Sequence, residues 1–297
     1  MADTSAASFI EWFTSHPSAV LSSACGIYQS EGMGRGCIAL QDIQEGDVLF
    51  SVPRSMVLST RTSSLPSLLG ELPRGWPGLI LCLSYEYLQQ DTWRPYFDIL
   101  PQSFNTPIFW EEQDLAELQG SAVLDKIGKK EAEESFAVLL DLVKARPDVF
   151  KEGYTMELFH RMGSLILSRS FTVEPPEEGG DVSMESAQQE QAADHIEADT
   201  SHDQSEESEI HHTADEEQEE EDASTVAMVP FADILNARSG SENAHLVYEE
   251  EVLNMTATRS IAQGEQILYV FLLLSLSLSL SLARALSRRK DQTDAVE

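Results

Sequence analysis

The chain has 297 residues, of which 42% are hydrophobic, and a formal net charge of −32 at pH 7. This length and hydrophobic content support a buried core in one large domain or two small ones. With 19 Lys and Arg against 51 Asp and Glu, the sequence lacks the basic surface that nucleic-acid binding requires. Three cysteines are too few for a disulfide framework or a zinc site, and residues 1–20 lack a signal-peptide pattern, so we expect the nucleus or the cytosol.

The N-terminal part predicts one helix followed by strands. Residues 8–15 have the pattern of a short amphipathic helix. Strands are expected at residues 37–40 and 48–52, joined by a turn at 44–47 in which Gly46 suits a positive φ. Residues 56–58 are expected to form a third strand, after Pro53 ends the second.

From residue 79 to about residue 171 the hydrophobic period becomes helical. Residues 79–88 predict a largely buried helix, and residues 125–145 carry apolar side chains at helical spacing up to Arg146-Pro147. Residues 155–171 predict a further helix. The aromatic stretch 93–101 is interpreted as a structural corner that packs these helices on the core.

An acidic segment follows. Between Glu174 and Asp222 lie 20 of the 51 acidic residues and no Lys or Arg. High charge without aromatic residues predicts a disordered insert at 174–224. We interpret the four histidines of this segment as solvated side chains, with a metal site as the alternative. They are His195, His202, His211 and His212.

Order is expected to return at Val226. Residues 246–248 and 252–257 predict a strand pair around an acidic turn. Residues 261–267 repeat the turn-then-strand pattern of residues 43–48, with Gly264 in the place of Gly46.

Two distant motifs suggest one ligand site. Gly34-Arg35-Gly36 precedes an apolar strand, and the apolar run 229–236 contains Asp233 and ends at Asn236. From these residues alone, other interpretations stay open. The glycines suit a simple turn, Asp233 a solvated acid, and Asn236 a helix or turn cap.

Four motifs in this order resemble the SET-domain protein-lysine methyltransferases of the Rubisco large-subunit methyltransferase class, in particular members that methylate ribosomal proteins. The motifs are Gly34 to Ile43, Trp93 to Pro101, Ser168 to Phe171, and Val229 to Asn236. The resemblance covers about residues 8–267, interrupted by the acidic segment. It implies an α+β fold: a SET-domain β-fold with a large helical insert.

The resemblance also implies a ligand and its contacts. Family members use S-adenosylmethionine, and Met33, Gly34 and Arg35 match a turn whose backbone approaches it closely. Arg169 matches an arginine that binds the cofactor carboxylate, although from sequence alone it could equally complement the dipole of its helix. Asn236 matches the asparagine of a knot-like crossing, and Asp233 a position that lines the substrate lysine channel.

The resemblance divides the chain into five parts. These are 1–64 (N-terminal helix and first part of the SET domain), 65–172 (helical insert), 173–224 (acidic insert), 225–267 (second part of the SET domain) and 268–297 (a Leu/Ser-rich tail outside the family pattern). The helical C-terminal substrate-binding domain of the family is expected to be missing. The tail suggests translated non-coding sequence, with a membrane anchor as the alternative.

In the family, the hydroxyl of a tyrosine lies at the reacting methyl. The position of that tyrosine in the family pattern is occupied by Phe271 in this chain. Tyr269, two positions earlier, is the substitute candidate, because side chains alternate along a strand. We therefore expect a lysine methyltransferase fold, acting on a protein substrate such as a large-subunit ribosomal protein, whose activity is weakened or lost.

Further expectations are a monomer in the nucleus without metal, nucleic acid or membrane partners. The alternatives are a cofactor- or protein-binding module without catalysis and a membrane-tethered acidic adaptor.

Overall fold

The computed structural model describes residues 4–30, 32–73, 75–89, 92–121, 128–173 and 225–269. The predicted acidic insert and nearly all of the predicted tail lie outside these ranges. The described helices are α1 (Thr4–Thr14), α2 (Leu65–Leu69), α3 (Trp76–Gln89), α4 (Arg94–Ile99), α5 (Glu112–Ala116), α7 (Lys129–Ala145) and α8 (Met156–Arg169), with the 3₁₀ turns η1 (Arg54–Met56), η2 (Pro107–Phe109) and η3 (Ala232–Ile234).

The described strands form three antiparallel sheets. One sheet has the order β1 (Val20–Leu21), β4 (Val48–Pro53), β8 (Val252–Ala257), β7 (Ala244–Tyr248). The second has the order β2 (Cys25–Ser30), β3 (Gly34–Ala39), β9 (Gln266–Ile267), and the third pairs β5 (Ser170–Val173) with β6 (Thr225–Met228). Strands from both ends of the chain therefore share sheets, as the α+β prediction requires.

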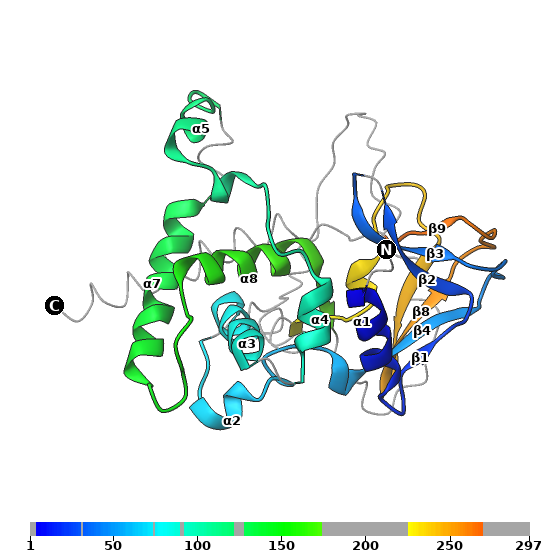
Figure 1. Cartoon of the computed structure of the whole chain (residues 1–297), viewed down its shortest axis with the longest axis horizontal. Helices are drawn as coiled ribbons and strands as arrows, with labels where there is room; N and C mark the ends of the chain where they lie inside the picture. Colours follow the sequence, from blue (N-terminus) through cyan, green and yellow to red (C-terminus); the bar gives the residue numbers. More distant parts are fainter. Residues whose placement is uncertain are drawn as a thin grey trace, which may run out of the picture.

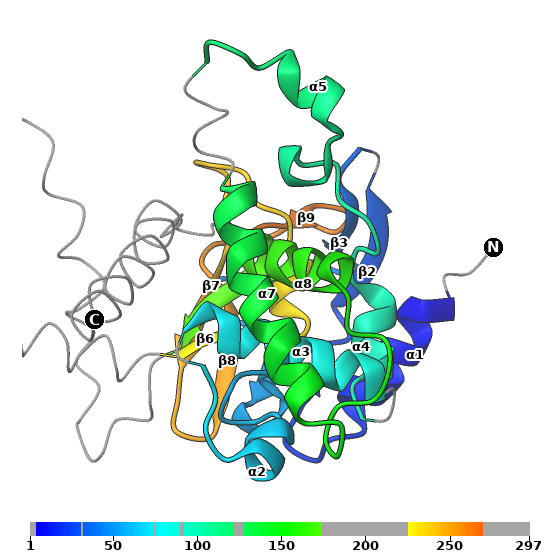
Figure 2. The same cartoon turned by 90° about the vertical axis from the view of Figure 1, so that its left-hand side faces the viewer.

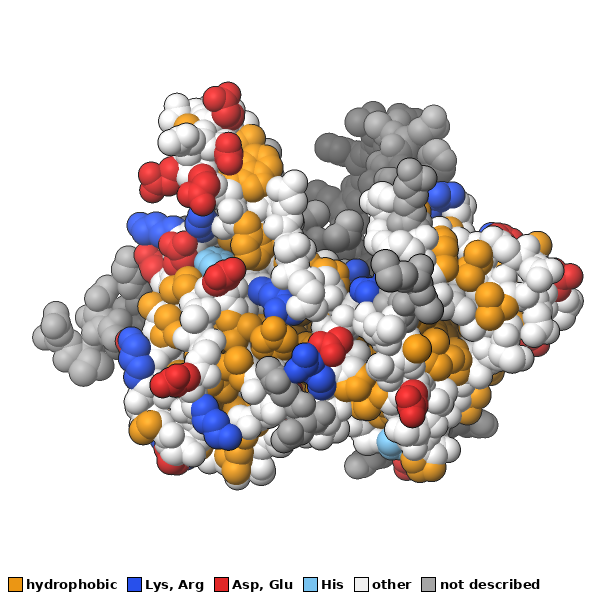
Figure 3. Space-filling view, viewed as in Figure 1, with side chains coloured by type: hydrophobic (Ala, Val, Ile, Leu, Met, Phe, Trp, Pro, Cys, Tyr) orange, Lys and Arg blue, Asp and Glu red, His pale blue; other side chains and the backbone are white. Residues whose placement is uncertain are grey.

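The two larger sheets and the longer helices lie on opposite sides of the molecule, with α1 and α4 where they meet (Figure 1). Figure 2 shows α7 and α8 crossing near α3 on the helical side. On the face in Figure 3, charged side chains of both signs are interspersed over the helical side. The helical insert thus lies beside the two larger sheets, and α3 and α8 also contact the small β5–β6 sheet.

The long helices form where the apolar period predicts them. α3 is buried on nearly all sides, as expected for a continuous apolar run. The N-terminal helix begins earlier than predicted, at Thr4, and the start of the predicted helix 125–145 lies outside the described residues. α8 begins after Thr155, whose hydroxyl accepts a hydrogen bond of 3.1 Å from the backbone N–H of Leu158.

Two predicted boundaries are wrong. The helix predicted over 155–171 ends at Arg169, because Phe171 leaves it to pair with Ala227 across β5 and β6. The strand predicted at 56–58 is instead the 3₁₀ turn η1 followed by a single bridge between Leu58 and Met228. In both places a partner far away in sequence decides the backbone conformation.

The repeated turn-then-strand segments pair with each other. Ile43 and Ile261 exchange backbone hydrogen bonds of 2.9 and 3.0 Å. Gly46 and Gly264 both have positive φ, 87° and 85°, as the turn pattern predicts. This pairing joins the two halves of the β-fold, which the acidic segment separates in sequence.

An aromatic cluster connects α1, α4 and the sheets. Phe231 packs on Phe50 with ring centroids 4.7 Å apart, and on Phe9 and Phe13 of α1. In α4, Tyr96 is fully buried and stacks on Trp12 at 6.2 Å. The interpretation of residues 93–101 as an aromatic corner is therefore confirmed.

Candidate active site

The two distant motifs meet at Gly36. A Cβ atom on this glycine would lie 2.5 Å from Nδ2 of Asn236 and 3.0 Å from Nε2 of Gln266. The Asn236 amide therefore occupies the space that any other side chain at position 36 would need. Gly34 serves a different purpose, because its φ of 75° is one that other residues rarely adopt. The glycines do begin a strand, β3, but they also bring it against Asn236.

The chain crosses itself beside this contact. Asn236 forms a parallel bridge with Leu268, and its carbonyl accepts a 3.1 Å hydrogen bond from the N–H of Tyr269. Asn236 lies one residue beyond Leu235, the C-cap of η3, so it does not cap that turn. The family resemblance implies a knot-like crossing at Asn236, and the bridge to Leu268 lies at that position.

Asn243 stabilises the crossing through hydrogen bonds to Gln266 and Leu268. Its side chain is fully buried, donates from Nδ2 to the carbonyl of Gln266 at 2.9 Å and accepts from the N–H of Leu268 at 2.8 Å. The sequence analysis assigned Asn243 no role in the site. A buried asparagine with both amide atoms satisfied holds β9 in the register that places Gln266 next to Gly36.

Asp233 is fully buried, so the interpretation as a solvated acid is wrong. The hydroxyl of Tyr96 donates to its Oδ2 at 2.6 Å, across 137 residues of sequence. Burial raises the pKa of Asp233 to about 6, while the Arg169 charge and the Tyr96 hydrogen bond oppose this rise. Sequence reasoning assigned Tyr96 a packing role only, and nothing in the local pattern indicates this bond.

Arg169 lies at the last turn of α8 and points to the same site. Its Nη1 donates to the backbone carbonyl of Asp233. The position also complements the helix dipole, and the role of Arg169 at a cofactor carboxylate stays a prediction. Its half-buried guanidinium retains further donors for an anionic group.

Met33 and Arg35, which flank Gly34, differ in their side-chain contacts. Arg35 donates from Nη1 to the carbonyl of Ile99 at 2.9 Å and from Nη2 to Ser5 Oγ at 3.2 Å, which ties β3 to α4 and α1. These bonds occupy the Arg35 side chain, and a contact of the Arg35 backbone with the cofactor stays a prediction. Met33 is 45% exposed at the start of the strand.

The backbone next to Asp233 is strained. Phe231 has φ 76° and ψ −46°, which a residue with a side chain rarely adopts. Its fully buried ring is fixed by the aromatic cluster described above. Such strain is typical of functional sites, where the surrounding packing maintains an unfavourable backbone that presents the next residues.

Tyr269 contacts the site through its backbone. Its ring lies 5.7 Å from that of Phe171, and burial raises the pKa of its hydroxyl. Phe271 lies outside the described residues, so the role of Tyr269 stays a prediction.

The described ranges contain no group of three or more His, Cys, Asp and Glu side chains placed to hold a metal. No helix within those ranges is both long and apolar enough to span a membrane.

A β-fold divided by a helical insert, with a glycine strand and an asparagine-bearing crossing in contact, defines the SET class of domains. The chain belongs to this family: the SET domain matches residues 34–271. Among relatives, ribosomal lysine N-methyltransferase 4 of Saccharomyces cerevisiae is 33% identical over 256 residues, covering 81% of this chain and 47% of the relative. Human N-lysine methyltransferase SETD6 is 30% identical over 252 residues, covering 80% and 45%.

Solved structures support the same fold. The SET domain of LSMT bound to lysine and AdoHcy superposes with a TM-score of 0.64 at 21% identity, covering 91% of this chain and 55% of that one. Rubisco LSMT bound to AdoMet gives 0.63 at 21%, covering 89% and 52%. The chain spans about half the length of the curated relatives it matches.

Proposed function

We propose that this chain carries the core of an S-adenosylmethionine-dependent protein-lysine N-methyltransferase. The observation that carries the proposal is the packing of the Asn236 amide on Gly36, because it brings together the two motifs that hold the cofactor in the family. Arg169 and Asp233 lie in contact beside it.

The residues at this site fit the cofactor. Nδ2 of Asn236 and Nε2 of Gln266 are buried and have no hydrogen-bond partner among the described residues. Buried donors of this kind call for acceptors, which the polar groups of a nucleoside and an amino acid provide. We assign cofactor binding to Met33, Gly34, Arg35, Arg169 and Asn236, with Arg169 on the carboxylate.

When bound, S-adenosylmethionine supplies a methyl group activated by a sulfonium. The contribution of the protein is to align the lysine amine, exclude water and let the amine lose its proton. We assign Asp233 to the lysine channel, where its negative charge favours an approaching ammonium.

For the substrate, we propose a ribosomal protein of the large subunit, methylated in the nucleus by a monomeric enzyme. The name of the yeast relative supports the ribosomal substrate. The three cysteines, which are free and buried, suit a reducing compartment.

The direct test is transfer of labelled methyl from S-adenosylmethionine to purified large ribosomal subunits. Asn236→Ala should abolish transfer, whereas Asn254→Ala should not. Asn254 is a matched control because its amide bonds to Glu249 at the surface. Equal labelling by the wild type and Asn236→Ala would refute the site.

A second candidate function is cofactor binding without methyl transfer. The sequence has Phe271 in place of the family tyrosine, and the ring of Tyr269 packs on Phe171. Calorimetry separates the two candidates, because binding of S-adenosylmethionine without transfer to any lysine substrate would favour the binding module.

A further inference from the structure

The helix α4 contacts the site at two places. The carbonyl of Ile99, at its end, accepts from Arg35 of β3, and the hydroxyl of Tyr96 donates to Asp233 beside η3. Both contacts connect the helical insert to the segments that form the cofactor site. α4 therefore helps to set the positions of Arg35 and Asp233.

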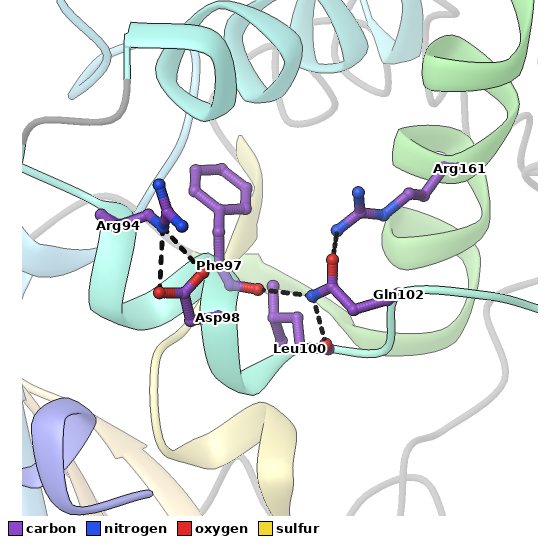
Figure 4. Close-up of polar contacts among 6 residues, drawn as sticks. All are labelled: Arg94, Phe97, Asp98, Leu100, Gln102 and Arg161. Carbon is purple, nitrogen blue, oxygen red and sulfur yellow. Dashed lines mark hydrogen bonds and ion pairs between the residues drawn. The ribbon is translucent and has the colours of Figure 1, made fainter. Parts of the chain in front are cut away.

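α4 is held by contacts other than the hydroxyl of Tyr96. Gln102 donates from Nε2 to the carbonyls of Phe97 and Leu100 at 2.9 and 2.8 Å, and accepts from Arg161 of α8 at 2.6 Å (Figure 4). The guanidinium of Arg161 also lies 4.6 Å from the ring centroid of Tyr87. With these contacts and the stacking on Trp12, a Phe at position 96 would keep its ring in place and lose only the hydroxyl.

The charged environment of Asp233 involves three elements. Tyr96 of α4 donates to Oδ2, Arg169 of α8 donates to its carbonyl, and the Cys37 thiol of β3 lies close enough to interact electrostatically. Burial raises the pKa of Cys37 well above its usual value, so this thiol is neutral. Oδ1 of Asp233 has no hydrogen-bond partner within the described residues.

We propose that Tyr96 is a positioning residue that holds the Asp233 carboxylate beside the cofactor site as a fixed negative charge, which favours a cationic ligand over its neutral counterpart. The inference rests on the proposed function. The cationic ligand is the sulfonium S-adenosylmethionine, and the neutral counterpart is its demethylated product, S-adenosylhomocysteine. The two share the same nucleoside and amino acid groups, so a buried charge distinguishes them mainly through the sulfonium.

The test compares how tightly the two ligands bind the full chain. Isothermal titration gives the dissociation constant of each from pH 5 to pH 8, and their ratio, product over cofactor, measures charge discrimination. In the wild type this ratio should fall as pH decreases through about 6, where Asp233 gains its proton. Asp233→Asn should lower the ratio at pH 7.5 by about three- to ten-fold and make it independent of pH.

Tyr96→Phe should move the midpoint of the wild-type profile to higher pH, because the lost hydrogen bond stabilised the charged carboxylate. The matched control is Tyr248→Phe, which removes a hydroxyl that donates to the carbonyl of Thr172 at 3.0 Å and should leave the profile unchanged. If Tyr96 had a purely structural role, Tyr96→Phe would weaken the binding of both ligands by the same factor and leave the ratio of their dissociation constants unchanged. That result would overturn the inference.

The remaining outcomes are also decisive. If Tyr96→Phe does not fold, the wild-type profile decides, because a flat ratio between pH 5 and pH 8 overturns the inference. If the wild type binds neither ligand, the proposed function itself fails, and this inference with it. If the wild type binds both ligands with a flat ratio, the proposed function stands and only the inference about Asp233 and Tyr96 is overturned.

Discussion

Gly36 shows how one missing side chain allows two distant segments to meet. In Gly36→Ala the added methyl would lie 2.5 Å from Asn236 Nδ2, so the amide must move. We expect S-adenosylmethionine affinity to fall at least about ten-fold and stability to fall by about 1–3 kcal/mol, the usual cost of overpacking. Calorimetry and urea unfolding measure the two effects.

Gly163→Ala is the matched control for this change. A Cβ at Gly163 in α8 would meet Ile80 and Phe136 at 3.6 Å, which is ordinary contact distance. This substitution should leave affinity unchanged and stabilise the helix by about 0.5–1 kcal/mol. If Gly36→Ala is tolerated as well as Gly163→Ala, the close contact with Asn236 is unimportant.

A second residue-scale prediction concerns the energetic cost of Asp233. Its pKa is about 6 in the folded state and near 3.8 when unfolded, so the folded protein holds this proton more tightly. Stability therefore decreases as pH rises from 3.8 through 6, by about 3 kcal/mol. Asp233→Asn should be more stable than the wild type in urea at pH 7.5 by on the order of 2–3 kcal/mol, and this advantage should vanish near pH 4.

At the scale of elements, His160 of α8 is held between η2 and α7. Its ring lies 6.1 Å from Phe109 and 5.0 Å from Phe136, and both ring nitrogens lack a hydrogen-bond partner among the described residues. Burial lowers its pKa, while Glu133, 3.9 Å away, acts in the opposite direction and Lys129 adds to the lowering. The imidazole therefore stabilises this packing only while it is neutral.

The pH dependence follows from the direction of this shift. The stabilisation is present above pH 6.5 and is lost as pH falls through the lower folded-state pKa. In thermal unfolding between pH 7 and pH 5, His160→Phe should lose less stability than the wild type. Parallel losses in the two proteins would show that His160 does not cause the acid sensitivity of these helices.

The elements also show what the sequence could predict. α3, α7 and α8 follow from apolar periods that are local, and the β7–β8 pair follows from two strand patterns around a short turn. β5 was missed because its partner, β6, begins after the acidic segment. The two motifs and the family resemblance predicted that the glycine segment and Asn236 share one site, but the direct contact at Gly36 was not predicted. The Tyr96–Asp233 bond has no local signal at all.

For the whole molecule, the ends of the acidic segment are close together. Val173 and Thr225 are cross-strand partners at the ends of β5 and β6, so a short turn could join them. We predict that replacing residues 175–223 with about six Gly and Ser residues preserves the fold and raises its stability by up to about 2 kcal/mol, because closing a shorter loop costs less entropy.

This prediction treats the acidic segment as a linker between two parts of one domain. The shortened protein should bind S-adenosylmethionine with unchanged affinity in calorimetry, since Gly36, Asn236 and Arg169 all lie outside the replaced residues. A segment that recruits a basic protein substrate would act differently. Its removal would raise KM for ribosomal subunits, more strongly at low salt, while cofactor affinity stayed the same. A lower unfolding temperature would contradict the linker interpretation, because it would mean that the segment stabilises the folded domain.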